Sequence, residues 1–397
     1  MAENSTIAFG RYLKMLRGRR KLSLQEVASL SDSFPDPISK GYLSRCENGH
    51  QKIALNKVIP LSRIYEVPSD VIVERLELDM EVDRLGAPDT EGRSFEWLRD
   101  EAKRHLDEGR GITSYALFRD SLMIAHSSPV LAPFHDPGEQ FMATLLNCAS
   151  CAKTSGCLSY AQHELLFALK HGQLAESTHA LVLDRLGQVY LLKNEIDLAR
   201  RHVDVAIEKA RSLGSFPQLS YLYGSRTLIA EAECDWELCL QCAQSGHDAA
   251  KQQGNLPEEV RHMNAIGYSY AKLERWRAAK RICLAAESMA KKHGIVRSVG
   301  HAQLVLGLVD IAEGRPTEAR TRLQAARDVG KQFEHTSLRF GAELALLKLA
   351  IQLDDSSHVR AIGRRMEKLV ARVDPHAVEL HEFRELAANV LPKYMLQ

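Results

Sequence analysis

The stretch SKGYLSRCENGH, residues 39–50, places side chains with hydrogen-bonding capacity at short spacing. Lys40, Ser44 and Arg45 would lie on the exposed face of a short helix, and each can donate a hydrogen bond to a phosphate or a base edge. Ser39 is a good N-cap for this helix, and Asn48-Gly49 is a typical left-handed end. The alternative is an ordinary structural helix, and the neighbouring elements decide between the two.

Cysteines form a second group with possible chemistry. CASC (148–151) and CLQC (239–242) have the Cys-x-x-Cys spacing of half a zinc site, and Cys148, Cys151 and Cys157 are the best candidates for a metal or redox role. The simpler interpretation is that these thiols pack as small apolar side chains. We therefore predict no metal site and no cofactor.

Catalytic signatures are missing from the sequence. It contains no G-x-x-x-x-G-K-[ST], no H-E-x-x-H and no G-x-S-x-G, and its 16 histidines are scattered. An enzyme is not expected.

Apolar spacing predicts a set of short helices around the opening stretch. Residues 7–18 present an apolar helical face, and Ser23 can cap a second helix, LQEVASL. SDSFPDPI interrupts the pattern with two prolines, and further helices follow over roughly 55–65 and from VPSDVIVERLEL onward. GAPDTEGRS (86–94) is the clearest boundary. We therefore expect a first domain over 1–75, a linker over 76–94 and a second domain over 95–397.

Charge is distributed unevenly between these parts. Residues 1–65 carry eleven Lys/Arg against five Asp/Glu, a net charge of +6, while the whole chain has a net charge of +1. A basic module on a mildly acidic body favours a polyanionic partner for the first part. No apolar run of about 18 residues and no signal peptide is recognisable, so we expect a cytoplasmic protein that does not bind membranes.

A 40-residue repeat fills the second part. Gly187, Tyr190, Ala199, Val203 and Ala206 recur as Gly267, Tyr270, Ala279, Cys283 and Ala286, with further copies at 227, 307 and, more weakly, 347 and 147. Small residues at fixed positions and a turn between two apolar stretches predict a stack of helical hairpins.

Residues 1–75 resemble the helix-turn-helix domains of the lambda-repressor-like (Xre) class, through FGRYLKMLRGRRKLS, LQEVA, SKGYLSRCENG and VPSDVI. The resemblance implies that the third helix enters the major groove of DNA, with Lys40, Gly41 and Ser44 at base-reading positions. It also implies that Arg17 and Glu47 form a buried ion pair. The turn between the second and third helices is about five residues longer than usual. The predicted DNA-contacting set is Gln25, Ser39, Lys40, Gly41, Ser44, Arg45 and Lys52.

The repeats resemble tetratricopeptide repeats, although their period is longer than the usual one of about 34 residues. The resemblance places certain positions of each first helix on a concave face. There Asn264 could bond both backbone groups of an extended peptide, and Arg261 could hold a carboxylate. The alternative is a solvated face without a ligand. The predicted ligand-binding set is Asp184, Arg185, Gln188, Ser225, Arg261, Asn264, Tyr268 and His301.

Together the two parts resemble the peptide-responsive quorum-sensing regulators called RRNPP. The predicted fold is all-α, with a five-helix helix-turn-helix domain followed by a tetratricopeptide-like α-solenoid of about six to seven helical hairpins. The implied function is a transcriptional regulator, a homodimer on a palindromic DNA operator, controlled by a short signalling peptide or another small ligand. Two alternatives remain: a scaffold that binds another protein without a small ligand, and a thiol or metal sensor.

Overall fold

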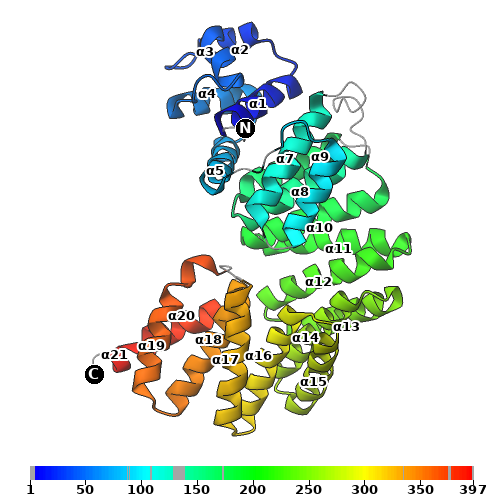
Figure 1. Cartoon of the computed structure of the whole chain (residues 1–397), viewed down its shortest axis with the longest axis vertical. Helices are drawn as coiled ribbons and strands as arrows, with labels where there is room; N and C mark the ends of the chain where they lie inside the picture. Colours follow the sequence, from blue (N-terminus) through cyan, green and yellow to red (C-terminus); the bar gives the residue numbers. More distant parts are fainter. Residues whose placement is uncertain are drawn as a thin grey trace. The chain divides into compact units, whose positions relative to one another are not determined.

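The computed structural model describes residues 5–86, 88, 90–107, 110–127, 139–171, 174–333, 335–373 and 377–395. Over these ranges the chain is all-α, with helices from α1 to α21 and one 3-10 turn, as the sequence predicted (Figure 1). Its contacts divide it into two units, residues 1–189 and 190–397, and each is described by itself. No helix in the described ranges has the length and apolarity that a bilayer crossing requires.

Five helices form the N-terminal part of the first unit, as predicted. They are α1 (Ser5–Arg19), α2 (Leu24–Ser31), α3 (Lys40–Glu47), α4 (Leu55–Tyr65) and α5 (Ser69–Leu85). Ser23 caps α2 in a capping box with Glu26, which satisfies two backbone donors at the helix start. The apolar face predicted for the first helix is buried, with Tyr12, Leu13 and Leu16 at most 1% exposed.

The fifth helix extends further than the expected domain boundary. Residues 76–85, which fall in the expected linker, form the last part of α5. This helix packs against α7 (Gly111–Ser127) and α9 (Leu158–His171) of the repeat region. The boundaries 1–75, 76–94 and 95–397 therefore stay a prediction, and the first compact unit includes both the helix-turn-helix part and the earliest repeats.

Buried charges join α5 to the early repeats. Arg75 Nε donates to Asp79 Oδ2 at 2.9 Å, and Arg119 Nη1 of α7 donates to Asp79 Oδ1 at 3.0 Å. From α1, Arg19 Nη1 and Nη2 donate to both oxygens of Glu164 in α9 at 3.0 and 2.8 Å. Pairing is what makes such burial tolerable, because an isolated buried charge costs several kcal/mol.

Helical hairpins occupy the rest of the chain. The helices not yet given are α6 (Phe95–Asp107), α8 (Glu139–Thr154), α10 (Glu176–Leu192), α11 (Ile196–Ser212), α12 (Phe216–Ala232), α13 (Trp236–Gln253), α14 (Leu256–Lys272), α15 (Trp276–Lys292), α16 (Val296–Ala312), α17 (Pro316–Gln332), α18 (Thr336–Gln352) and α19 (Ser356–Glu367). First helices begin at 176, 216, 256, 296 and 336, which confirms the period predicted from the sequence.

The repeat is visible in the backbone and in the packing. Positive φ angles recur with the same period at Asn194, Cys234, Glu274, Gly314 and Asp354, in the turn between the two helices of each hairpin. The register glycines are needed for close helix crossing. A Cβ on Gly267 would lie 2.1 Å from Cys283 Sγ, and one on Gly307 would lie 2.7 Å from Leu323.

The chain ends in η1 (Val370–Arg372), α20 (Val378–Asn389) and α21 (Leu391–Met395). Apolar residues of this segment could either cap the stack or pair with a second subunit. Leu380, Phe383 and Leu391 are at most 3% exposed, in one apolar cluster with residues of α18 and α19. They therefore close the stack within one chain.

Candidate nucleic-acid interface and ligand groove

Helix α3 is held to α1 by an apolar seam and one ion pair. Leu43 and Cys46 are 1% and 2% exposed, and Glu47 is buried beside them. Arg17 Nε and Nη2 donate to the two carboxylate oxygens of Glu47 at 2.7 and 2.8 Å, which confirms the predicted pair. The bond to Glu47 raises the pKa of Arg17. A bidentate pair of this kind fixes the orientation of α3.

Close backbone approach reinforces that orientation. A Cβ on Gly10 of α1 would lie 2.2 Å from the Cys46 carbonyl oxygen, so α1 and α3 can cross this closely only at a glycine. Beyond the helix end, the Ala54 N–H donates to the Tyr42 hydroxyl at 2.8 Å. The contact ties α3 to the loop that precedes α4.

The opposite face of α3 is open. Lys40, Gly41 and Arg45 are exposed and Ser44 is half-buried. Ser39 caps the helix by accepting from the Tyr42 N–H at 3.1 Å. The structure thus brings these five predicted residues together on one side and at the start of α3. Within the described part of the chain, the Lys40 ammonium group contacts no acidic side chain.

The two other predicted residues lie outside the helix. Gln25 is exposed in the first turn of α2, and Lys52 is exposed between α3 and α4. The whole set of DNA contacts stays a prediction.

Two polar residues beside this face were not in the predicted set. Asn48 Nδ2 donates to the Ser44 carbonyl oxygen at 2.8 Å, and Gln51 Oε1 accepts from Arg45 Nε at 2.9 Å. The spacing of four residues from Ser44 to Asn48 could have indicated the first contact. Gln51 follows the end of the helix, and no local spacing indicates its contact.

The long turn before α3 is internally bonded. Ser31 Oγ accepts from the buried Ile38 N–H at 2.7 Å, and Lys57 Nζ donates to the Pro37 carbonyl oxygen at 3.0 Å. The extra residues are thereby accommodated while Ile38 fills the core at 1% exposure.

Three predicted groove residues lie together on α10. The buried Asp184 carboxylate accepts from Gln188 Nε2 at 2.9 Å and lies 3.4 Å from Arg185 Nη1. Lys153 of α8 donates to Gln188, and burial lowers the pKa of Lys153 to about 8. The arrangement is a polar cluster whose members bond one another.

The other predicted groove residues lie in the second unit, and helix contacts occupy most of them. Ser225 is buried on α12. Asn264 Nδ2 donates to the Ser298 carbonyl oxygen at 2.9 Å, which links α14 to α16. The Arg261 guanidinium lies so close to α12 that a Cβ on Gly224 would be 2.3 Å from Nη2. Arg261 remains exposed and pairs with Glu258.

Tyr268 and His301 also have partners. The Tyr268 hydroxyl donates to Glu379 Oε1 of α20 at 2.5 Å. His301 packs edge-on against His335 with ring centroids 5.0 Å apart, and burial lowers the pKa of His301 to about 3, so the ring is neutral at physiological pH. The predicted ligand-binding role of the set stays a prediction.

The predicted ligand-binding set does not include the charged residues around α20. Lys272 Nζ of α14 donates to Glu382 Oε1 at 2.9 Å, and Lys348 Nζ of α18 donates to Glu382 Oε2 at 2.5 Å. These partners are separated by 110 and 34 residues, and no spacing rule indicates such contacts.

The cysteines behave as core residues. Seven of the eight are buried, all are free thiols, and the described residues contain no cluster suited to a metal ion. Burial raises the pKa of Cys151 to about 11 and that of Cys157 to about 12. Both thiols are therefore protonated at neutral pH, which disfavours thiolate chemistry.

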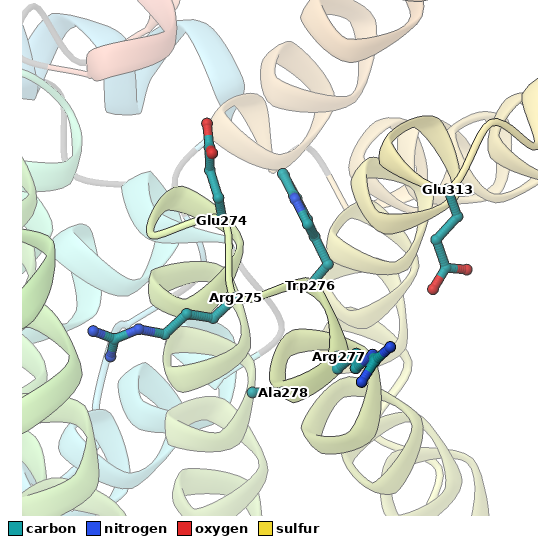
Figure 2. A pocket seen from close by; sticks show the side chains of 6 residues that line it. All are labelled: Glu274, Arg275, Trp276, Arg277, Ala278 and Glu313. Carbon is teal, nitrogen blue, oxygen red and sulfur yellow. The ribbon is translucent and has the colours of Figure 1, made fainter.

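One open hollow of about 730 Å³ lies at the turn between α14 and α15 (Figure 2), lined by Glu274, Arg275, Trp276, Arg277, Ala278 and Glu313. Arg275 points away from Glu313 in this view, and each already has a partner: Arg275 Nη2 lies 2.5 Å from Glu237 and Lys280 Nζ lies 2.8 Å from Glu313. Arg275 and Glu313 are therefore already engaged within the chain.

Comparison with known families supports the first part of this description. Residues 8–76 match the family model described as "Helix-turn-helix domain". The comparison with curated protein sequences gave no match. The N-terminal part is therefore a helix-turn-helix DNA-binding domain.

Solved structures agree with the repeat fold. The apo form of RapI is similar with a TM-score of 0.50 at 10% identity, covering 74% of this chain and 80% of that one. The STAND protein PH0952 of Pyrococcus horikoshii, which has a tetratricopeptide repeat sensor, is similar with a TM-score of 0.53 at 13% identity. There the match covers all of this chain and 63% of that one. The helical repeats are tetratricopeptide-like.

Proposed function

We propose that the protein is a transcriptional regulator that binds an operator through α3 and responds to a ligand in its repeats. The observation that carries the proposal is the outward row of Lys40, Ser44 and Arg45 on a helix locked by Arg17 and Glu47. A rigid helix with donors on its free face suits the major groove, where base edges present acceptors. A regulator that binds DNA agrees with the cytoplasmic location expected for this protein.

The operator is proposed to be palindromic and bound by a homodimer. One small helix-turn-helix domain can make only a few base contacts. Each good bidentate contact favours the correct base over a wrong one by only about 1–3 kcal/mol. Two such domains, bound to half-sites one helical turn apart, supply the specificity that a single domain lacks.

The ligand is proposed to be a short signalling peptide in the groove of the first helices. Exposed Arg261 supports this role because a guanidinium can hold a peptide carboxylate bidentately. Stacked helical repeats form extended binding surfaces, and the sequence contains none of the catalytic motifs named above, so we propose a receptor and not an enzyme.

A selection experiment tests the DNA-binding role. Purified full-length protein is incubated with fragments of its own genome, beside a Lys40→Ala, Ser44→Ala variant and a Lys331→Ala control on the exposed surface of α17. We expect a palindromic sequence that the wild type and the control recover and the double variant loses. Recovery of the same fragments by all three proteins would exclude α3 as the reading element. Recovery of nothing with a co-purifying protein partner would favour the scaffold alternative.

A further inference from the structure

Helix α20 returns to the first helices of the preceding repeats. It packs against α18 (Figure 1), and its carboxylates bond α14 and α18. Glu379 accepts from the Tyr268 hydroxyl, and Glu382 accepts from both Lys272 and Lys348. Glu379 also approaches Gly341 of α18, where an added Cβ would lie 4.0 Å from its Oε1 atom.

The contacts fall at equivalent positions of consecutive repeats. Tyr268, Leu308 and Lys348 occupy the same place in three successive copies, one position after the register residue of each. Tyr268 and Lys348 bond α20, and Leu308 packs in the apolar cluster that contains Leu380 and Phe383. The equivalent residue of the preceding repeat, Leu228, is 50% exposed. Helix α20 therefore covers the groove from α14 to α18. On α12, Leu228 stays exposed, although Glu379 lies close enough to Glu231 to raise its pKa.

Two sides of α20 enter these contacts. Glu379 and Glu382, three residues apart, bond the polar wall of the groove, formed by Tyr268, Lys272 and Lys348. Leu380 and Phe383, also three residues apart, are buried. Phe383 meets Phe340 edge-on with ring centroids 5.7 Å apart. Such spacing is the pattern with which an amphipathic helix binds a groove.

The surface that faces α20 carries two lysines, Lys272 and Lys348, and the carboxyl group of Glu231 lies near Lys272. Lys272 and Lys348 both bond the single carboxylate of Glu382, and burial would raise the pKa of Glu382, but these bonds lower it. Lys272 also lies 5.3 Å from the Trp236 ring centroid and 5.4 Å from that of Tyr268. Without α20 the surface would present two ammonium groups, a phenol donor and an apolar floor.

We propose that the groove of α14, α16 and α18 takes an acidic amphipathic peptide, and that α20 is the resident segment which this peptide displaces. The inference rests on the proposed sensing role of the repeats and specifies the chemical class of its ligand. Two carboxylates one helical turn apart would replace Glu379 and Glu382, and apolar side chains would replace Leu380 and Phe383. Because α20 is tethered, it competes at high effective concentration, and a free peptide must bind more tightly to displace it.

The test uses the full-length chain and a labelled synthetic peptide with the sequence of residues 377–392, AVELHEFRELAANVLP. A Glu379→Gln, Glu382→Gln chain weakens the resident helix and leaves the groove wall intact. We expect it to bind the peptide at least tenfold more tightly than the wild type. Its α20 amides should exchange hydrogen at least tenfold faster, while those of α15, which packs against α14 and α16, stay unchanged and report a folded stack.

Matched variants test whether the lysines of the groove wall bind the peptide. In the Glu379→Gln, Glu382→Gln background, adding Lys272→Gln and Lys348→Gln should abolish peptide binding. Adding Lys251→Gln and Lys331→Gln, exposed lysines of α13 and α17, should leave it unchanged. A control peptide with glutamine in place of Glu379 and Glu382 should bind at least tenfold more weakly than the acidic peptide.

Several results would overturn the inference. Equal binding of the acidic and the amide peptide would remove the charge argument, and unchanged exchange of α20 in the Gln chain would show that the carboxylates do not hold the helix. No binding despite fast exchange would show that the groove does not take an acidic segment. A doubled mass of the Gln chain without peptide would assign the groove to the α20 of a second copy.

Operator affinity separates this inference from the proposed function. If the acidic peptide displaces α20 without changing the affinity for operator DNA, the groove chemistry holds and the sensing role fails. If another ligand changes operator affinity and the acidic peptide does not bind, the sensing role holds and the acidic ligand is wrong.

Discussion

Helix α3 and the groove of α14, α16 and α18 use polar residues in opposite ways. On α3, the inward ion pair of Arg17 and Glu47 supports the helix, and Lys40 on the outward face is exposed. In the groove, Tyr268, Lys272 and Lys348 all bond carboxylates of α20. One surface is ready for its partner, and the other is already occupied by a segment of its own chain.

The difference indicates how each surface can be used. An exposed face binds whenever its partner is present, and its affinity depends on charge and salt. An occupied groove binds only what outcompetes its occupant, so its response has a threshold set by that occupant. The open surface suits the proposed DNA binding, and the occupied one suits the proposed conditional response to a ligand.

The largest effect is expected for the support of α3. Arg17→Ala would leave the Glu47 carboxylate buried without its partner, at a cost of about 3–5 kcal/mol in the free energy of unfolding. Denaturant unfolding, followed by circular dichroism, measures this loss. The exposed Arg63→Ala on α4 is the control and should change stability by less than about 0.5 kcal/mol. Similar values for the two variants would show that the ion pair does not hold α3.

The next effect concerns the occupied groove. Tyr268→Phe removes the donor to Glu379, a hydrogen bond to a charged group that contributes about 1.5–3 kcal/mol. We expect the amides of α20 to exchange faster by the factor that this loss of free energy corresponds to, with little change in α15. Tyr221→Phe, at a tyrosine that is 46% exposed on α12, should leave exchange in α20 at its wild-type rate. An identical rate in both variants would mean that apolar contacts alone retain α20.

On the open face, Lys40→Ala should weaken operator binding by about 1–3 kcal/mol if Lys40 contacts a base edge. Folding should be unaffected because the side chain is exposed. Titration of labelled operator at several salt concentrations measures both affinity and salt slope. Lys14→Ala, an exposed lysine on α1, provides the comparison for general charge loss. A uniform loss for operator and random DNA would assign Lys40 to a phosphate.

A graded effect, small over any single pH unit, is expected from pH. Burial and then the Glu379 carboxylate raise the pKa of Glu231 to about 8, against the opposing effects of Lys272 and Arg261. The folded chain therefore keeps a proton that the unfolded chain loses above about pH 4.5. The free energy of unfolding should fall by up to about 1.4 kcal/mol per pH unit as pH rises from about 4.5 to 8.

Denaturant unfolding at half-unit steps from pH 5 to 8.5 measures this slope. Glu231→Gln should flatten it, and Glu274→Gln, at an exposed glutamate in the next turn, should not. A slope that survives Glu231→Gln would show that another group carries the pH dependence.

Local rules account for much of what the sequence predicted correctly. The repeat period determines the helix starts, because each hairpin repeats the same small residues at its crossing and the same turn between its helices. Ser39 and Ser23 indicate helix starts through side-chain caps, which need only three following residues. The prediction that α5 would give way to a linker after residue 75 did not anticipate its length, since α5 is stabilised by contacts with α7 and α9.

The candidate sites also contain some features that local spacing predicts and others that depend on tertiary contacts. Exposure of Lys40 and Arg45 follows from helical spacing, because Leu43 and Cys46 must face the core. The bonding of Asn264 to α16 does not follow from spacing, since a register position specifies a face and not a partner.

The sequence by itself therefore determined the helical class, the repeat and the outward face of α3, all properties of residues within one or two helical turns. Only the tertiary structure decided what fills the groove. The carboxylates of Glu379 and Glu382 meet Tyr268 and Lys272 from a distant part of the chain. No periodic pattern indicates that meeting, because it depends on the cumulative path of the intervening hairpins, which brings distant residues together only once the stack has formed.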